Sequence, residues 1–170
     1  MLHPTLDEVK ELATRGLGNL VPIYREVTAD LETPVSAFLK VRTGKYSFLL
    51  ESVEGGERMA RYSFIGTQPY RVVRTGPGEE WEGDPLTPLE QEVSRFREIP
   101  VEGVPAFTGG AIGYVSYDAV RHFEPRVKPP EADELGIPEA IFLFCDSMVV
   151  FDHIRHTIKV LAHCRLDGDI

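Results

Sequence analysis

The sequence predicts an α+β fold, in which several antiparallel strands carry a few amphipathic helices on one side. Three observations lead to this prediction. Helical segments are short, and each follows a threonine that can cap it. Strand-like runs are separated by glycine and proline. The last two such runs, 140–152 and 157–163, are joined by a short polar turn, which is typical of an antiparallel hairpin.

The first two helices have clear start signals. Thr5 and Glu8 form a T-x-x-E capping box, in which each side chain bonds the backbone N–H of the other residue, and Gly16 ends the run. The second helix follows Thr33 as its N-cap, with Pro34 at the first helical position. Both segments carry apolar residues at helical spacing, which indicates one face directed at a core.

A third helix is expected to start at Thr87 and Pro88, where Glu90 completes a second T-x-x-E box. Its apolar residues again recur at helical spacing, and it should end by Pro100. We therefore expect a third amphipathic helix in the middle of the chain.

The strand-like segments between the helices differ in character. The stretch 20–27 is predicted to be an edge strand, because Pro22 cannot donate a hydrogen bond to a neighbouring strand. The stretch 45–53 contains a short run, 48–50, that is predicted to be buried. Further strands are expected at 61–65, 70–75 and 109–117.

Length and charge bound the function. A chain of 170 residues fits one domain with a real core. The net charge of −9 argues against nucleic-acid or anionic-membrane partners, because both would require an excess of lysine and arginine. No segment has the apolar length of a membrane span, and the first residues do not resemble a secretory signal. With only two cysteines, we expect a cytoplasmic protein with reduced thiols.

The common catalytic motifs are missing, so no catalytic residue is assigned. The sequence contains neither a G-x-S-x-G nucleophile motif nor a phosphate-binding loop nor a dinucleotide fingerprint. The glycines of 109–113 lack the lysine and the strand-to-helix setting of a phosphate loop, which favours close backbone packing. Cys145 follows an apolar run and is interpreted as a core residue rather than a nucleophile.

One cluster of histidine and cysteine residues is a candidate metal site. It consists of His153, His156, His163 and Cys164. The first two histidines would need a helical turn to share a face, yet they fall at the expected hairpin turn. We therefore favour a solvated turn beside a partly buried strand histidine and assign no metal ligands.

The end of the 45–53 strand is the most informative polar feature. Here Leu49 and Leu50 lead directly into Glu51 and Ser52. By strand alternation Leu50 and Ser52 share one face, while Leu49 and Glu51 share the other. Such a strand end can present a carboxylate to an ammonium group, with a hydroxyl beside it. From the residues alone, a small-molecule site and a strand running out into solvent both remain open.

Several segments together resemble the amino-terminal region of the anthranilate synthase component I family. They are VPIYRE from Val21, TPVSAFLK from Thr33, FLLES from Phe48, RYSFIG from Arg61, GGAIGYVSYDAVRHFE from Gly109 and VVFDH from Val149. The resemblance extends over nearly the whole chain, and its specificity lies in the order and spacing of the segments. It implies that residues 1–170 form an amino-terminal regulatory domain within a larger layered sandwich of two antiparallel sheets.

The resemblance also implies a function. The family makes anthranilate from chorismate and ammonia in tryptophan biosynthesis, and its LLES segment is associated with feedback binding of L-tryptophan. On this basis Leu50 would lie against the indole, Glu51 would meet the amino group and Ser52 would hydrogen-bond. Arg61 is a weaker candidate for the ligand carboxylate.

Other parts of the family's function would lie outside this chain. The chorismate site and its Mg²⁺ are implied for a carboxyl-terminal domain that is absent here, so the chain alone should be inactive. The resemblance also implies a partner, the glutamine amidotransferase subunit called component II, which would donate the ammonia and which the amino-terminal region would help to bind.

Two alternatives remain. Component I of aminodeoxychorismate synthase has a similar architecture and a related LES-type segment, although the 33–40 and 61–66 segments favour anthranilate synthase. The other alternative is a free-standing amino-acid-binding module.

Overall fold

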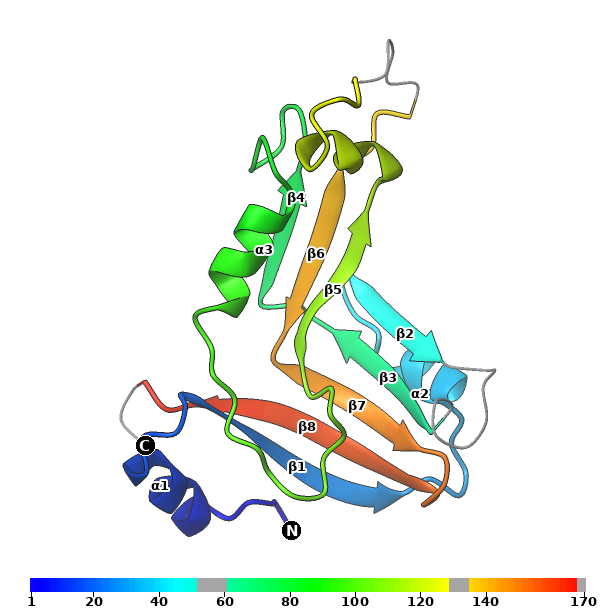
Figure 1. The fold of residues 1–170 in the computed structure, drawn as a ribbon. Helices are drawn as coiled ribbons and strands as arrows, with labels where there is room; N and C mark the ends of the chain where they lie inside the picture. The colour runs from blue at the N-terminus through cyan, green and yellow to red at the C-terminus, as the bar shows by residue number, and fades with distance from the viewer. Residues whose placement is uncertain (52–60, 129–134, 168–170) are drawn as a thin grey trace. The chain divides into compact units, whose positions relative to one another are not determined.

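The computed structural model describes residues 1–51, 61–128 and 135–167 (Figure 1). The chain divides into two compact units. The first unit comprises Met1–Pro69, Phe96–Gly110 and Cys145–Ile170, and the second comprises Tyr70–Arg95 and Ala111–Phe144. The chain passes from the first unit to the second and back twice, so each unit is built from separate stretches of the sequence. That residues 1–170 form one regulatory domain stays a prediction.

The first unit holds most of the secondary structure. Its helices are α1 (Leu6–Thr14) and α2 (Pro34–Val41), and its strands are β1 (Leu20–Thr28), β2 (Ser47–Glu51), β3 (Tyr62–Thr67), β7 (Ser147–Asp152) and β8 (Thr157–Arg165). The strands form one antiparallel sheet in the order β1-β8-β7-β3-β2. β1 is an edge strand, as Pro22 predicted, and β2 forms the opposite edge.

One face of this sheet packs against α2. Ala37 of α2 forms a buried cluster with Ile65 of β3, Phe151 of β7 and Ile158 of β8, three strands that are neighbours in the sheet. α1 packs nearby in the same unit, through a second cluster formed by its Val9 and by residues of β1 and the 97–101 segment. The capping boxes expected at Thr5 and Thr33 are both present, so the local start signals of both helices are confirmed.

The opposite face of the sheet is crossed by the 103–108 segment. Gly103 lies against the Tyr24 side chain of β1, where a Cβ would collide with the phenol oxygen. Further along, Thr108 lies 3.1 Å from His163 Nε2 of β8, and Phe107 packs on Phe64 of β3. By register, these three strand residues share a face, so a single segment spans the sheet from β1 to β3.

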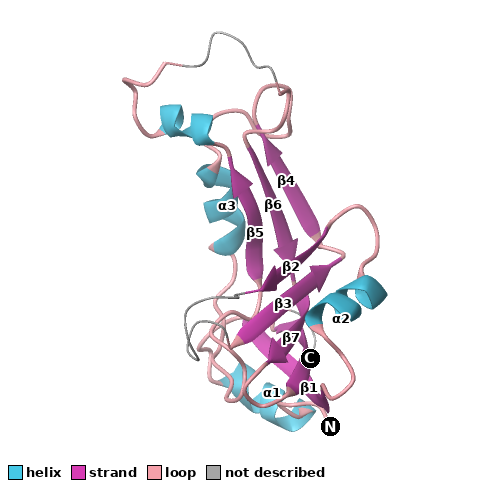
Figure 2. Ribbon diagram, turned by 90° about the vertical axis from the view of Figure 1, so that its right-hand side faces the viewer, coloured by secondary structure: helices cyan, strands magenta, loops and turns pink. Residues whose placement is uncertain are grey.

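The second unit is smaller. It contains β4 (Arg71–Thr75), α3 (Leu86–Val93), β5 (Gly110–Val115), the 3-10 helix η1 (Tyr117–His122) and β6 (Ala140–Cys145). The sheet order is β4-β6-β5, and α3 lies along this sheet (Figure 2). The core contains buried apolar residues of β4 and β6, with Leu89 of α3 packed against them. Gly113 of β5 lies against the Ile141 backbone of β6, as close packing of the 109–113 glycines predicted.

The antiparallel α+β prediction is confirmed, but three details were wrong. α3 begins at Leu86 without a threonine cap, because Asp84 Oδ1 accepts the N–H of Leu86 at 2.8 Å and starts the turn earlier than Thr87. The 48–50 run is not buried, because it lies in the edge strand β2, which has a neighbouring strand on one side only. The expected strand 140–152 is two strands, β6 and β7, that belong to different sheets and are separated at Asp146.

Candidate functional site

The predicted effector residues lie at the end of edge strand β2. Leu50 and Glu51 are its last two residues, and Ser52 lies outside the described residues. Leu50 pairs with Phe64 of β3, whereas Glu51 pairs with Ser63. Since neighbouring residues of a strand point to opposite faces, the Leu50 and Glu51 side chains emerge on different sides of the sheet. Leu50 and Glu51 therefore lie on opposite faces of the sheet, as strand alternation predicted from the sequence.

Aromatic side chains gather on the Leu50 face. The ring of Phe64 lies 6.1 Å from that of Tyr62 and 5.2 Å from that of Phe107, centroid to centroid. The Phe64–Phe107 pair meets edge to face at 84°, a favourable arrangement for two aromatic quadrupoles. All three rings are half-buried, and Leu50 beside them remains 43% exposed. This surface is apolar yet partly open to solvent.

Arg61 lies beside this apolar surface, next to the ring of Tyr62. Its guanidinium lies 4.8 Å from the ring centroid of Tyr62, and its Nε and Nη2 donate to the carboxylate of Asp152 at 3.1 and 2.6 Å. The Asp152 carboxylate also accepts the backbone N–H groups of Ile154 and Arg155 in the β7–β8 turn. Burial alone would raise the pKa of Asp152, but the bonds from Arg61 and the turn outweigh it and lower this pKa. The same pairing raises the pKa of Arg61.

Arg61 is thus a cation that the fold holds in place beside Tyr62. The pair with Asp152 uses two of the five N–H donors of a guanidinium, which leaves donors for a ligand carboxylate. The structure places this weaker candidate on the same face as Leu50, because Asp152 and Tyr62 are register partners.

A different polar pair lies on the Glu51 face. The hydroxyl of Ser63, which is 1% exposed, is 2.7 Å from His153 Nε2. The His153 ring stacks on Phe151 at 6.4 Å, and its backbone N–H donates to the carbonyl of Arg61 at 2.9 Å. Sequence reasoning assigned neither residue to a site, although Ser63 falls within the RYSFIG segment and His153 within VVFDH. Because Ser63 is buried, we interpret the pair as a structural contact that joins β3 to the end of β7.

The histidine cluster is dispersed. His153 and His156 lie in the β7–β8 turn, as expected. The Nε2 atom of His163 lies 3.1 Å from the Thr108 hydroxyl and 3.4 Å from the Glu98 carboxylate. Among the residues that the structure describes, no group of three or more His, Cys, Asp and Glu side chains could hold a metal ion. Cys145 is 4% exposed, and burial raises the pKa of its thiol to about 11, as suits a core residue rather than a nucleophile.

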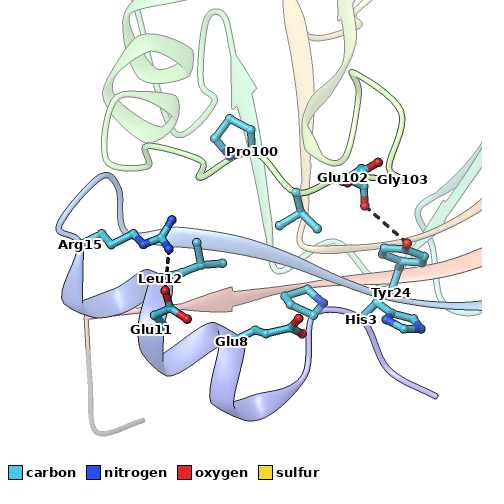
Figure 3. A pocket seen from close by; sticks show the side chains of 11 residues that line it. His3, Glu8, Glu11, Leu12, Arg15, Tyr24, Pro100, Glu102 and Gly103 are labelled. Carbon is cyan, nitrogen blue, oxygen red and sulfur yellow. Dashed lines mark hydrogen bonds and ion pairs between the residues drawn. The ribbon is translucent and has the colours of Figure 1, made fainter.

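A cavity of about 590 Å³ lies elsewhere in the first unit, beside α1 (Figure 3). Its walls are formed by His3, Pro4, Glu8, Glu11, Leu12, Arg15, Tyr24, Pro100, Val101, Glu102 and Gly103. Arg15 is paired with Glu11 at 2.6 Å, and two hydrogen bonds from Thr5 lower the pKa of Glu8, which therefore acts as a helix cap. None of the residues that the sequence singled out for effector binding lines this cavity.

No helix in the described ranges is long and apolar enough to cross a membrane.

Comparison with known proteins gives a consistent result. A family model described as chorismate binding enzyme matches residues 45–169. The probable anthranilate synthase component 1 of Schizosaccharomyces pombe is 47% identical over 95% of this chain and 32% of its own length. Anthranilate synthase component 1 of Acetivibrio thermocellus is 40% identical over 100% of this chain and 36% of its own length.

A solved structure agrees with these relatives. The crystal structure of anthranilate synthase component I from Streptococcus pneumoniae TIGR4 superposes with a TM-score of 0.53 and 25% identity, over 85% of this chain and 32% of that one. The chain thus spans about a third of the length of the relatives it matches. Its sequence and its fold both place it with these proteins, and the chain belongs to the family of chorismate binding enzymes.

Proposed function

We propose that this chain is part of an anthranilate synthase component 1 and carries part of an L-tryptophan feedback site. The observation that carries the proposal is the 47% identity, over 95% of the chain, to a relative with that name. The names of the compared relatives favour anthranilate over aminodeoxychorismate as the product of the whole protein. A regulatory role is proposed for this part because its LLES segment, Leu49 to Ser52, resembles the family's feedback segment.

The effector site would be built around the end of β2. Leu50 offers an exposed apolar contact, and Arg61 offers a held cation for a carboxylate on the same face. Glu51 and Ser52 stay in the proposal as ligands of the amino group, with Glu51 reaching around the sheet edge. β2 has no neighbouring strand on its outer side in the described sheet, so a ligand can approach along that edge.

The remaining components of the whole protein are also proposals. Mg²⁺ would be bound with chorismate outside this chain, as the family resemblance implies. A glutamine amidotransferase subunit would deliver ammonia. The two free cysteines support a reducing, cytoplasmic setting.

Two measurements test the proposal. Alone, the chain should produce no anthranilate fluorescence from chorismate, ammonia and Mg²⁺. When it is joined to the remaining two-thirds of the Schizosaccharomyces pombe relative, anthranilate fluorescence should appear. In that joined protein, Glu51→Ala and Ser52→Ala should relax inhibition by L-tryptophan. Inhibition as strong as in the parent would show that the site is wrongly assigned, and a product other than anthranilate would refute the enzyme assignment.

A further inference from the structure

The cavity beside α1 has no part in the proposed effector function. It lies wholly within the first unit, and its walls are formed mainly by α1 on one side and by the 100–103 segment on the other (Figure 3). Its volume of about 590 Å³ falls within the range of small-molecule sites, which is about 300–1,000 Å³. The cavity therefore has room for an organic ligand and not only for a single ion.

The fold holds the walls of this cavity in place. The backbones of His3 and Tyr24 exchange two hydrogen bonds, at 2.9 and 2.7 Å, and the Tyr24 hydroxyl donates to the carbonyl of Glu102 at 3.4 Å. We define the apolar floor as Leu12 of α1 and Val101, which both line the cavity and pack against a buried core cluster. Because the core supports this floor, the site is formed before any ligand arrives.

Two carboxylates stand on different walls without a lysine or arginine partner among the described residues (Figure 3). Glu8, on α1, accepts both of its hydrogen bonds from Thr5 at Oε2, at 2.7 and 2.8 Å, which leaves Oε1 for a ligand. These bonds lower the pKa of Glu8, so it is ionised at neutral pH. The carboxylate of Glu102, on the other wall, has no hydrogen-bond partner within the described ranges. The third carboxylate, that of Glu11, is neutralised by Arg15 at 2.6 Å.

We propose that this cavity binds an aliphatic diamine, with one ammonium group at Glu8, the other at Glu102 and the hydrocarbon chain against the apolar floor. Ammonium groups donate charge-assisted hydrogen bonds to carboxylates, and the methylene groups between them gain by leaving water. A monoamine would meet only one of the two carboxylates. An anionic ligand would be repelled by both of them. The cavity therefore selects a ligand with two positive ends and an apolar middle.

The test is a calorimetric titration of the chain with 1,4-diaminobutane, its homologues from 1,3-diaminopropane to 1,6-diaminohexane, and 1-aminobutane. At least one diamine should bind more tightly than the monoamine, and added salt should weaken its binding. Glu102→Gln keeps the size of the side chain and removes its charge, so it should weaken binding of that diamine about two- to fivefold, as expected for one exposed ion pair. Glu90→Gln removes the same charge from an exposed position of α3 and is the matched control, which should leave the affinity unchanged.

Methyl chemical shifts provide a second measurement. Addition of the diamine should shift the NMR signals of Leu12 and Val101 on the apolar floor, and leave those of Leu89 in the second unit unchanged. The proposal is wrong if no diamine binds, if 1-aminobutane binds as tightly as every diamine, or if Glu102→Gln and Glu90→Gln have the same effect. Shifts at Leu89 without shifts at Leu12 would also refute it. None of these outcomes bears on the effector function, whose residues do not line this cavity.

Discussion

Replacing Asp152 by asparagine isolates the charge that holds Arg61 in place. Oδ1 of Asp152 accepts the N–H groups of Ile154 and Arg155 at 3.2 and 3.1 Å, and asparagine retains an oxygen that can do the same. The β7–β8 turn should therefore persist, while the ion pair with Arg61 is lost. The substitution separates the electrostatic contribution of this residue from its part in the turn.

The expected loss follows from the burial of the two partners. The side chain of Asp152 is 1% exposed, so its charge is well shielded from water, whereas that of Arg61 is 31% exposed. Hydrogen bonds to buried charged groups contribute about 1.5–3 kcal/mol, and exposed ion pairs at most about 1 kcal/mol. For this intermediate case we expect about 1–2 kcal/mol at pH 7. In a chain of this length that corresponds to a Tm lowered by about 2–8 °C.

The pH dependence provides the decisive measurement. Because the folded-state pKa of Asp152 is lowered, its contribution is complete above the unfolded pKa of about 4 and is lost as pH falls through the folded pKa. Urea unfolding should show that the parent has a higher free energy of unfolding than Asp152→Asn at pH 7. This difference in free energy should be smaller at pH 3. Asp30→Asn, at an exposed loop residue, is the control. Equal free energies of unfolding for parent and variant at pH 7, or a difference that is as large at pH 3 as at pH 7, would refute the reasoning.

Three further predictions concern other parts of the chain. Gly113→Ala should destabilise the second unit by about 3 kcal/mol, because its Cβ would overlap the carbonyl oxygen of Ile141, and amide exchange in β5 and β6 should report the loss. Ser63→Ala should cost about 1 kcal/mol in urea unfolding, because it removes the partner of His153 Nε2. At pH 8, Cys145 should resist iodoacetamide until the chain unfolds, because burial raises its pKa to about 11; peptide mass spectrometry would show this.

Each of these predictions has an internal control. Gly78→Ala places a Cβ in open space at φ +74° and should cost only about 1 kcal/mol. Ser63→Thr retains the hydroxyl and should recover part of the stability lost in Ser63→Ala. Cys164 is only partly buried and should be labelled first. Equal losses at the two glycines, a Ser63→Ala variant as stable as the parent, or equal labelling of both thiols would contradict the corresponding argument.

Local chemistry explains which elements could be predicted. The caps at Thr5 and Thr33 involve residues three apart, and the edge position of β1 follows from the missing N–H of Pro22, so the sequence alone predicts them. The start of α3 was missed because Asp84 supplies the first acceptor ahead of the more obvious Thr87. The division of 140–152 into β6 and β7 was missed because both halves are rich in apolar residues and only the short polar stretch at Asp146 and Ser147 separates them.

The candidate site was predictable only in part, because some of its contacts join residues that are far apart in the sequence. The LLES segment located the end of β2, and alternation correctly separated the faces of Leu50 and Glu51. The pairing of Arg61 with Asp152 joins residues 91 positions apart, and Phe107 reaches Phe64 from a segment with no strand pattern. Such contacts depend on sheet register and on the path of the 103–108 segment, which short-range patterns do not encode.

The pairing of β1 with β8 also has a consequence for synthesis. Leu20 lies opposite Arg165 and Thr28 opposite Thr157, so β1 leaves the ribosome long before its partner strand exists. During that interval its backbone N–H and C=O groups are unpaired, and an unpaired strand can join other chains. Pro22, which lacks one of those donors, reduces this risk in β1 itself. The closure of such distant strands should make folding of the first unit slow, and a nascent chain that stalls before β8 should depend on chaperones to remain unaggregated.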